Sequence, residues 1–454
     1  MEGDGLPKTF FSLLTQAAEE VSKYAEVRVL THYDADGISS AGILSTVFMR
    51  RGIRFQLTLV KSLDEATIAR VGEAAGCLVL ADLGASFLPQ LEALEASVVV
   101  FDHHAPVGGS EKVLHVNPHL VGIDGMTSGC AGAVCMMFAL AMDDRNWDLL
   151  PIAFAGIVGD RQHIRGLSGI NRWLLEGGLS RKILELRPGS LLPDGKLADG
   201  LASCYDPYII GVSGSLEGAM SLLRESGIPE DAELMQLNEN ERRRLSSLIA
   251  LRLIGQGCTT SSLEELTADQ FFFPGRKTTG KDLAQLLDAC GRASQEGLGV
   301  AVALGDAKAM EAAERLRKEY TESVLKAMGT VIAEGVAKKR HLQYFISSNP
   351  SLSGILAGLT MQFVGDRDKP TIVLSYKEDK VRVSSRATFD LLAKGVDLAA
   401  GLREAAAAVG GQGGGHSIAS GATVDKGKDQ EFIEKLDEIL GKQKEAKAAG
   451  APVT

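Results

Sequence analysis

Four aspartate-bearing segments stand where predicted apolar strands or a helix end, and one of them also carries two adjacent histidines. They are His32-Tyr33-Asp34-Ala35-Asp36-Gly37, Ala81-Asp82-Leu83-Gly84, Asp102-His103-His104 and Gly159-Asp160. Five carboxylates and up to three imidazoles gathered in one place would repel one another and raise the carboxyl pKa values. One or two divalent cations would remove that repulsion. The sequence therefore predicts a metal-dependent active site.

Carboxylates combined with one or two imidazoles suit Mn²⁺ or Mg²⁺ better than a structural zinc. Asp34 and Asp36 are two residues apart in a predicted loop, so both can face one crevice. Two such ions about 3.5–4 Å apart would clamp an in-line phosphoryl displacement. One ion would lower the pKa of a bound water, and both would neutralise the phosphate oxygens. The expected chemistry is therefore hydrolysis of a phosphate ester.

The apolar runs that precede the aspartates predict buried parallel strands. Residues 27–31, 77–81 and 97–101 are rich in Val and Leu and alternate with helical patterns. In an open parallel sheet, ligands bind beyond the carboxyl ends of the strands, which is where the aspartates stand. Further predicted elements are a strand at 54–60, a helix at 39–50 capped by Ser39, a helix at 130–142 capped by Ser128, and a helix at 147–158 that delivers Asp160.

A chain of 454 residues is too long for a single core and predicts several domains. The expected fold class is α/β. We expect a parallel-sheet domain at 1–190, a middle or inserted region at 191–305, a connector helix at 306–341, a smaller α/β domain at 342–425, and a terminal helix with a disordered tail at 426–454. Within the middle region, residues 282–290 predict a helix and residues 299–304 predict a strand.

A glycine run at residues 410–416 follows one predicted helix and precedes a predicted strand. This order is the reverse of the dinucleotide-binding fingerprint, which opens a helix. The backbone amides of the run could form an anion-binding nest, and Ser384 and Arg386 could clamp a phosphate. The alternative is a flexible loop that ends a helix, with His416 incidental.

Composition narrows the classes of function. The net charge of −10 does not favour broad, non-specific binding to duplex DNA, although a narrow basic groove stays compatible with it. The six cysteines form no Cys-x-x-Cys pair, which disfavours a zinc knuckle. The acidic start Met1-Glu2-Gly3-Asp4 does not resemble a signal peptide, and no apolar run is long enough to cross a bilayer. A soluble, cytoplasmic protein without membrane partners is expected.

Taken together, these segments resemble the DHH phosphoesterase superfamily. His32-x-Asp34-x-Asp36-Gly37, Asp82, Asp102-His103-His104 and Asp160 are similar to its four motifs, and Ser384-Ser385-Arg386 with Gly413-Gly414-Gly415-His416 resembles its DHHA1 domain. Asp206-Pro207-Tyr208, Leu287-Asp288-Ala289-Cys290-Gly291-Arg292 and Ala303-Leu304-Gly305-Asp306 look like segments of the archaeal RecJ-like nucleases. The resemblance covers most of residues 25–425.

This resemblance implies a two-lobed, single-strand-specific exonuclease that uses two Mn²⁺ or Mg²⁺ ions. The implied metal ligands are Asp34, Asp36, Asp82, His103 and Asp160, with Asp82 and Asp160 as bridging carboxylates. Asp102 would orient the catalytic His103 and His104, and His104 would contact the scissile phosphate. Substrate would be gripped from the other lobe by Ser384, Arg386, Gly413, Gly414, Gly415 and His416. His32 departs from the spacing of the phosphatase members, so its assignment as a ligand stays open.

Three functions follow as hypotheses. The first is an exonuclease that releases mononucleotides from single-stranded DNA or RNA, with roles in DNA repair and replication. The second is a phosphodiesterase for short oligoribonucleotides or cyclic dinucleotides, which the large middle region disfavours. The third is a non-catalytic replisome scaffold, since the family implies association with GINS and the replicative helicase. Because every acidic motif is intact, the sequence favours an active enzyme.

Overall fold

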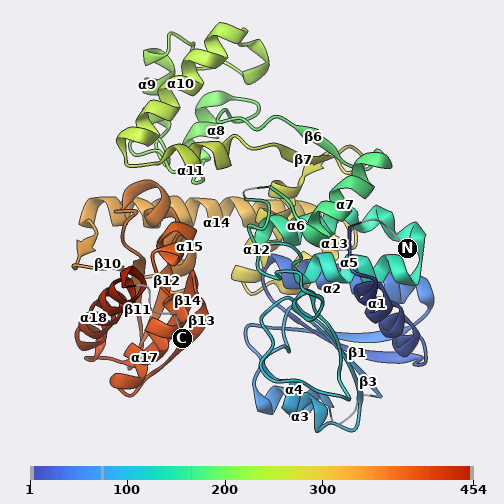
Figure 1. Ribbon diagram of the computed structural model, residues 1–454. Helices are drawn as coiled ribbons and strands as arrows, with labels where there is room; N and C mark the ends of the chain where they lie inside the picture. The colour runs from blue at the N-terminus through green and yellow to red at the C-terminus, as the bar shows by residue number, and fades with distance from the viewer. Residues whose placement is uncertain (1–4, 73–75, 165, 450–454) are drawn as a thin grey trace. The chain divides into compact units, whose positions relative to one another are not determined.

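The computed structural model describes residues 5–72, 76–164 and 166–449. Within these ranges the chain forms two compact units (Figure 1). The first comprises residues 1–189 and 269–318, and the second comprises residues 190–268 and 319–454. The acidic start at residues 1–4 and the last part of the predicted tail, residues 450–454, lie outside the described residues. Each unit has its own hydrophobic core.

A parallel sheet of five strands forms the centre of the first unit, with the order β2-β1-β3-β4-β5. All four pairings are parallel, as the buried apolar runs predict. This result confirms the predicted α/β fold class. The strands are β1 (Glu26–His32), β2 (Arg54–Val60), β3 (Cys77–Ala81), β4 (Ser97–Phe101) and β5 (Leu114–Val116).

Helices cover both faces of this sheet, which explains why its strands are apolar on both sides. Alternate strand residues such as Val79 and Val99 pack with α1, α2, α5 and α6, while Leu78 and Leu80 pack on the other side with α3 and α4 (Figure 1). These helices are α1 (Lys8–Val21), α2 (Ala35–Arg51), α3 (Glu65–Gly72), α4 (Leu88–Glu92), α5 (Ala131–Met142) and α6 (Leu150–Gly159); the 3₁₀ turns η1 (Pro118–Val121) and η2 (Asp144–Leu149) and helix α7 (Gly169–Ser180) complete the layer.

The rest of the first unit consists of a small antiparallel sheet and two helices. The sheet has the order β6-β7-β8, from β6 (Glu185–Arg187), β7 (Gln270–Phe273) and β8 (Thr278–Thr279). The helices are α12 (Gly280–Arg292) and α13 (Glu296–Ala303). The strand predicted at residues 299–304 is therefore wrong. An apolar run buried on all sides has no period that separates a strand from a helix, and Ala303 packs here against Gly42 of α2.

The second unit combines a helical region with a six-stranded sheet. The helical region contains α8 (Leu197–Ser203), α9 (Leu216–Glu225), η3 (Leu234–Gln236), α10 (Glu239–Gly255) and α11 (Thr260–Leu266). The sheet has the order β13-β14-β12-β11-β10-β9, from β9 (Ala337–Lys338), β10 (Gln343–Ile346), β11 (Thr371–Lys377), β12 (Lys380–Arg386), β13 (Gln412–His416) and β14 (Ala419–Asp425). Around it lie α15 (Ser353–Leu359), the π-helical turn η4 (Thr360–Val364), α16 (Phe389–Ala393), α17 (Leu398–Ala408) and α18 (Asp429–Ala448).

Two segments differ from the expected organisation. The middle region 191–305 is divided between the units, because residues 190–268 pack in the second unit and residues 269–318 in the first. The long helix α14 (Ala307–Glu334) passes from one unit into the other. At the C-terminus, α18 continues to Ala448, where a disordered tail is predicted. Leu436 and Leu440 anchor that helix in the core of the second unit.

Candidate metal centre

The first motif places three side chains around the junction of β1 and α2. His32 ends β1, and Asp34 is the N-cap of α2, where its carboxylate accepts a hydrogen bond of 3.1 Å from the Gly37 N–H. Gly37 is required, because a Cβ atom there would lie 2.2 Å from the His32 carbonyl oxygen. The helix thus begins at Ala35, earlier than predicted, and Ser39 lies inside it, donating to the Ala35 carbonyl at 2.7 Å rather than capping the helix.

Asp36 lies in the first turn of α2 rather than in a loop, and it is buried. Its two carboxylate oxygens accept hydrogen bonds of 2.8 Å from the N–H groups of Ala131 and Gly132. These N–H groups are free to donate because they belong to the first turn of α5. The N-cap of α5 is Cys130, so the predicted cap Ser128 is also wrong. Asp36 therefore joins two helix N-termini beside β1.

Asp82 follows β3 and is almost fully buried, with a left-handed φ of 62°. Asp102 follows β4 and has a different role. Its Oδ1 accepts hydrogen bonds from the His104 ring Nδ1 at 2.7 Å and from the His103 N–H at 2.8 Å, and its Oδ2 accepts one from Ala85 at 2.8 Å. Burial raises the pKa of Asp102, but the bonds from His104 outweigh this effect and hold it below its usual range. Asp102 is thus an ionised residue that orients the histidines.

His103 and Asp160 complete the centre. Asp160 is the C-cap of α6, as predicted from the apolar helix before it. The Nε2 of His103 lies 3.3 Å from Asp82 Oδ1, 3.3 Å from Asp160 Oδ2 and 3.9 Å from Asp36 Oδ2. The structure also brings His32 to the centre, with its Nδ1 3.1 Å from Asp34 Oδ2 and 3.3 Å from Asp82 Oδ2. All eight side chains of the four motifs thus meet at the carboxyl ends of β1, β3 and β4.

These side chains form three overlapping groups, in each of which one ligand atom per residue lies within 4.8 Å of the others. The groups are His32 with Asp34 and Asp82; Asp36 with His103 and Asp160; and Asp82 with Asp102, His103 and His104. Asp82 belongs to two of them. The donors are mainly carboxylate oxygens with imidazole nitrogens, which suits hard divalent cations.

The pKa values show that the clustered carboxylates repel one another. Burial and the neighbouring charge of Asp82 raise the pKa of Asp36 to about 7. Burial and Asp36 likewise raise the pKa of Asp160. Although burial lowers the pKa of His103, Asp160 and Asp82 outweigh it and raise that pKa well above its usual value. Excess negative charge of this kind is relieved either by protons or by cations.

The other predicted site residues belong to the second unit. Ser384 and Arg386 lie on β12, and Gly413 to His416 form β13 instead of the expected loop. Arg386 and His416 are both registered opposite Ala419 of β14, which places them on one face of the sheet. Close packing explains two of these glycines. A Cβ atom at Gly413 would lie 2.5 Å from the Leu402 carbonyl oxygen of α17, and one at Gly415 2.8 Å from that of Ala419.

Several residues that contact the centre carry no sequence motif. The side chain of Asn117 donates to the His104 carbonyl oxygen at 2.9 Å, and the Gly125 carbonyl accepts from His103 Nδ1 at 2.9 Å. Gln162, buried two residues after Asp160, donates to the same carbonyl at 2.8 Å. These contacts are formed between segments far apart in sequence, and only the position of Gln162 beside Asp160 could have hinted at its place.

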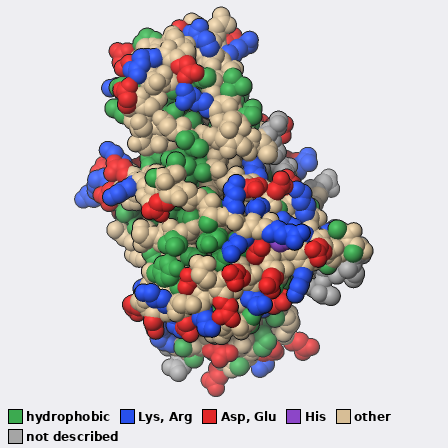
Figure 2. All heavy atoms as spheres, turned by 90° about the vertical axis from the view of Figure 1, so that its left-hand side faces the viewer, with side chains coloured by type: hydrophobic (Ala, Val, Ile, Leu, Met, Phe, Trp, Pro, Cys, Tyr) green, Lys and Arg blue, Asp and Glu red, His purple; other side chains and the backbone are tan. Residues whose placement is uncertain are grey.

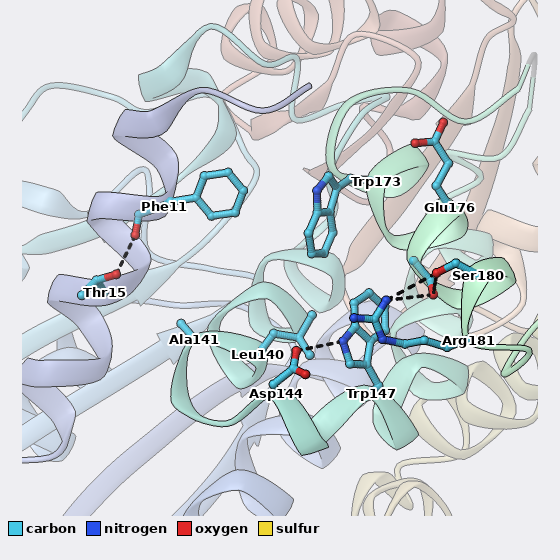
Figure 3. A pocket seen from close by; sticks show the side chains of 11 residues that line it. Phe11, Thr15, Leu140, Ala141, Asp144, Trp147, Trp173, Glu176, Ser180 and Arg181 are labelled. Carbon is cyan, nitrogen blue, oxygen red and sulfur yellow. Dashed lines mark hydrogen bonds between the residues drawn. The ribbon is translucent and has the colours of Figure 1, made fainter. Parts of the chain in front are cut away.

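A cavity of about 590 Å³ lies elsewhere in the first unit, between α1, α5, η2 and α7 (Figure 3). Both tryptophans of the chain line it: the rings of Trp147 and Trp173 are stacked 5.7 Å apart, and the Arg181 guanidinium lies 4.2 Å from the Trp147 ring. The cavity shares no residue with the acidic cluster. It touches α5 at Leu140, about 14 Å along the helix from Ala131, which binds Asp36.

Comparison with known proteins agrees with this architecture. Residues 342–442 match the DHHA1 domain family. An uncharacterized protein of Methanocaldococcus jannaschii is 28% identical over 443 residues, covering 95% of this chain and 97% of that protein.

Three solved structures share the fold. RecJ from Thermus thermophilus, in complex with Mn²⁺, has a TM-score of 0.59 at 17% identity; the match covers 95% of this chain but only 55% of RecJ. A second structure, the exonuclease RecJ bound to manganese, has a TM-score of 0.55 at 16% identity and covers 94% of each chain. CDC45 from Entamoeba histolytica has a TM-score of 0.62 at 14% identity, over 95% of this chain and 99% of CDC45.

The chain thus combines a parallel sheet that ends in an Asp-His-His cluster with a DHHA1 domain at residues 342–442. Its fold is shared with the solved RecJ structures. In the residues that the structure describes, none of the helices has the length and apolar character needed to span a membrane.

Proposed function

We propose that the protein is a single-strand-specific exonuclease that hydrolyses DNA or RNA to mononucleotides with two divalent cations, Mn²⁺ or Mg²⁺. The observation that carries the proposal is the position of Asp82 between His32 and His103, 3.3 Å from each. One carboxylate that faces two groups of ligands suits a pair of ions that share it.

His32, Asp34 and Asp82 would hold one cation, and Asp36, Asp82, His103 and Asp160 the other. Bound cations would supply Lewis acidity and a water of lowered pKa. The Asp36 carboxylate is fixed for this task by the two N–H groups of α5. His104 is oriented through Nδ1 by Asp102, and its assigned role is to contact a phosphate oxygen. Asp102 keeps that ring in one orientation through the reaction.

The second unit supports the same proposal with groups suited to a phosphate backbone. Arg386 and His416 share a sheet face with Ser384 of β12, so a cation, an imidazole and a hydroxyl lie on the same face. On the face shown in Figure 2, Lys and Arg side chains are interspersed with Asp and Glu. Mixed charge of this kind disfavours a wide surface for duplex DNA, which needs a basic face.

Two other functions are alternatives to this proposal. The likeness of fold to CDC45 favours a scaffold that binds GINS and the replicative helicase, but retention of every acidic ligand favours catalysis. A phosphodiesterase for short oligoribonucleotides or cyclic dinucleotides would use the same metal centre. The helical region at 190–268 adds to the second unit a segment that such small substrates do not require.

The test is an end-labelled degradation assay. Long single strands of DNA and of RNA, labelled at either end, are incubated with the protein and Mn²⁺, beside Asp102→Ala and His103→Ala. Mononucleotides released by the wild type alone support the proposal. Cleavage restricted to very short or cyclic substrates would replace it with the second function. If the folded wild type shows no metal-dependent turnover, the scaffold function would be favoured instead.

A further inference from the structure

The carbonyl oxygen of Gly125 accepts two hydrogen bonds beside the metal centre. One is donated by His103 Nδ1 at 2.9 Å and the other by Gln162 Nε2 at 2.8 Å. Because a carbonyl oxygen can only accept, Nδ1 must carry a proton. In the neutral ring the lone pair is then on Nε2, the atom that faces Asp82 and Asp160. The Gly125 carbonyl therefore selects the tautomer of His103 that can ligate a cation.

Gln162 holds that carbonyl in place. Its side-chain oxygen accepts hydrogen bonds of 3.0 Å from the Gly129 N–H and of 2.7 Å from Asn171 Nδ2. Since Gly129 offers a backbone donor and Gly125 a backbone acceptor, only one orientation of the amide satisfies both. Gln162 is only 3% exposed, so water does not replace these partners easily.

Gln162 binds the Gly125 carbonyl and the Gly129 N–H, which both belong to one short segment, residues 125–132. At its start, Gly125 binds His103, and at its end Ala131 and Gly132 bind Asp36. Gln162 itself follows the Asp160 cap of α6, and its own N–H donates to the Ile157 carbonyl at 3.0 Å. The Gln162 side chain therefore connects the segments that hold three predicted ligands, which are His103, Asp36 and Asp160.

We propose that Gln162 is a positioning residue of the metal centre, which fixes the ring of His103 and its spacing to Asp36 and Asp160 by clamping Gly125 and Gly129. This inference rests on the proposed function, because it requires that the centre binds cations. Partners of this kind, which touch the ligands rather than the ion, commonly change metal affinity by about 10–100-fold when removed. These contacts require one N–H donor and one oxygen that accepts two hydrogen bonds, and the side chain of glutamine supplies both.

The experiment compares the wild type with Gln162→Met, which keeps the length of the side chain but loses all three hydrogen bonds. Mn²⁺ affinity is measured by calorimetric titration, and thermal unfolding is measured without metal. The His103 Nδ1 proton is followed by nitrogen-edited NMR of the Mg²⁺-bound protein. We expect Mn²⁺ affinity to fall by about 10–100-fold and the Nδ1 proton to lose its protection from exchange.

Gln343→Met is the matched control, since Gln343 is also buried and hydrogen-bonded but belongs to the second unit. This variant should lower the melting temperature and leave Mn²⁺ affinity unchanged.

If Gln162→Met does not fold, Gln162→Glu takes its place, because a carboxylate retains the two accepted bonds and lacks only the donor to Gly125. Loss of protection at His103 Nδ1 is then the expected result. Wild-type Mn²⁺ affinity and a protected proton in the folded variant would overturn the inference while leaving the proposed function intact. An equal loss of affinity in Gln343→Met would also overturn it. A folded wild type that binds no Mn²⁺ would instead refute the metal centre itself.

Discussion

The Oδ1 atom of Asp82 lies 3.3 Å from Nε2 of His103, while the other oxygen of the same carboxylate lies 3.3 Å from His32. A single buried carboxylate thus faces both His32 at the end of β1 and His103 after β4. If Asp82 is shared by two cations, Asp82→Asn should weaken Mn²⁺ binding by more than about 100-fold, since even partners outside the ligand sphere are worth about 10–100-fold. Calorimetric titration would check the affinity and the number of ions. Asp148→Asn, which alters a carboxylate paired with Arg50, is the control. Two tight Mn²⁺ ions in Asp82→Asn would refute the shared site.

His104 should affect turnover rather than metal binding. Its Nδ1 is hydrogen-bonded to Asp102 at 2.7 Å, and His104 and Asp102 belong to the same group of candidate ligands. His104→Ala should lower kcat by about 10²–10³-fold, the usual effect of removing one donor that stabilises developing negative charge. Mn²⁺ affinity measured in the same samples should stay close to that of the wild type. Full turnover by His104→Ala would exclude this histidine from the chemistry.

The stability of the metal-free protein should fall as pH rises. Burial and Asp82 raise the pKa of Asp36 from its ordinary 3.8 to about 7. The folded protein then holds a proton that the unfolded chain releases, so this stabilising contribution is complete below pH 3.8 and is lost as pH rises to about 7. Mn²⁺ needs the ionised carboxylate, so its affinity should rise over the upper part of the same range. Melting curves at several pH values, with and without Mn²⁺, would show the two trends, and a stabilisation by Mn²⁺ that does not grow with pH would contradict them.

Gly415→Ala should weaken binding of single strands and leave Mn²⁺ affinity unchanged. Gly415 has a φ of 139°, and a Cβ atom would lie 2.8 Å from the Ala419 carbonyl oxygen, so the pairing of β13 with β14 would be strained by about 1–3 kcal/mol. That strain would displace His416 from its register beside Arg386. Strand affinity can be measured by fluorescence anisotropy with a labelled oligonucleotide. Gly358→Ala, which meets no atom within 4 Å in the same unit, is the control. Equal strand affinities in the variant and the wild type would remove β13 from the proposed binding surface.

Gly177→Ala should destabilise the first unit, because a Cβ atom there would lie 2.2 Å from the Trp147 ring. We expect the free energy of unfolding to fall by about 1–3 kcal/mol, as for other overpacked sites. Gly329→Ala in α14 meets no atom within 4 Å and should instead add about 0.5–1 kcal/mol through helix propensity. Denaturant titration followed by tryptophan fluorescence would measure both. An unchanged midpoint in Gly177→Ala would mean that Trp147 can move away without loss.

The order of residue types along the chain was enough to predict the sheet and the composition of the metal centre. Short apolar runs rich in Val and Leu, such as residues 77–81 and 97–101, favour central strands. The aspartates that follow them must then meet, because the carboxyl ends of parallel strands share one edge. Asp82 and Asp102 could therefore be assigned to one site without coordinates.

Packing between distant segments settled the rest, because such contacts leave no local pattern. Whether residues 299–304 became a strand or a helix depended on packing against α2, which no apolar run reveals. The glycine run became β13 because α17 and β14 approach its backbone closely. Gln162 gained its partners only when α6, α7 and the segment before α5 converged around its side-chain amide. Local residue types were therefore enough to predict the ligands, whereas the groups that hold the ligands depend on how whole elements pack.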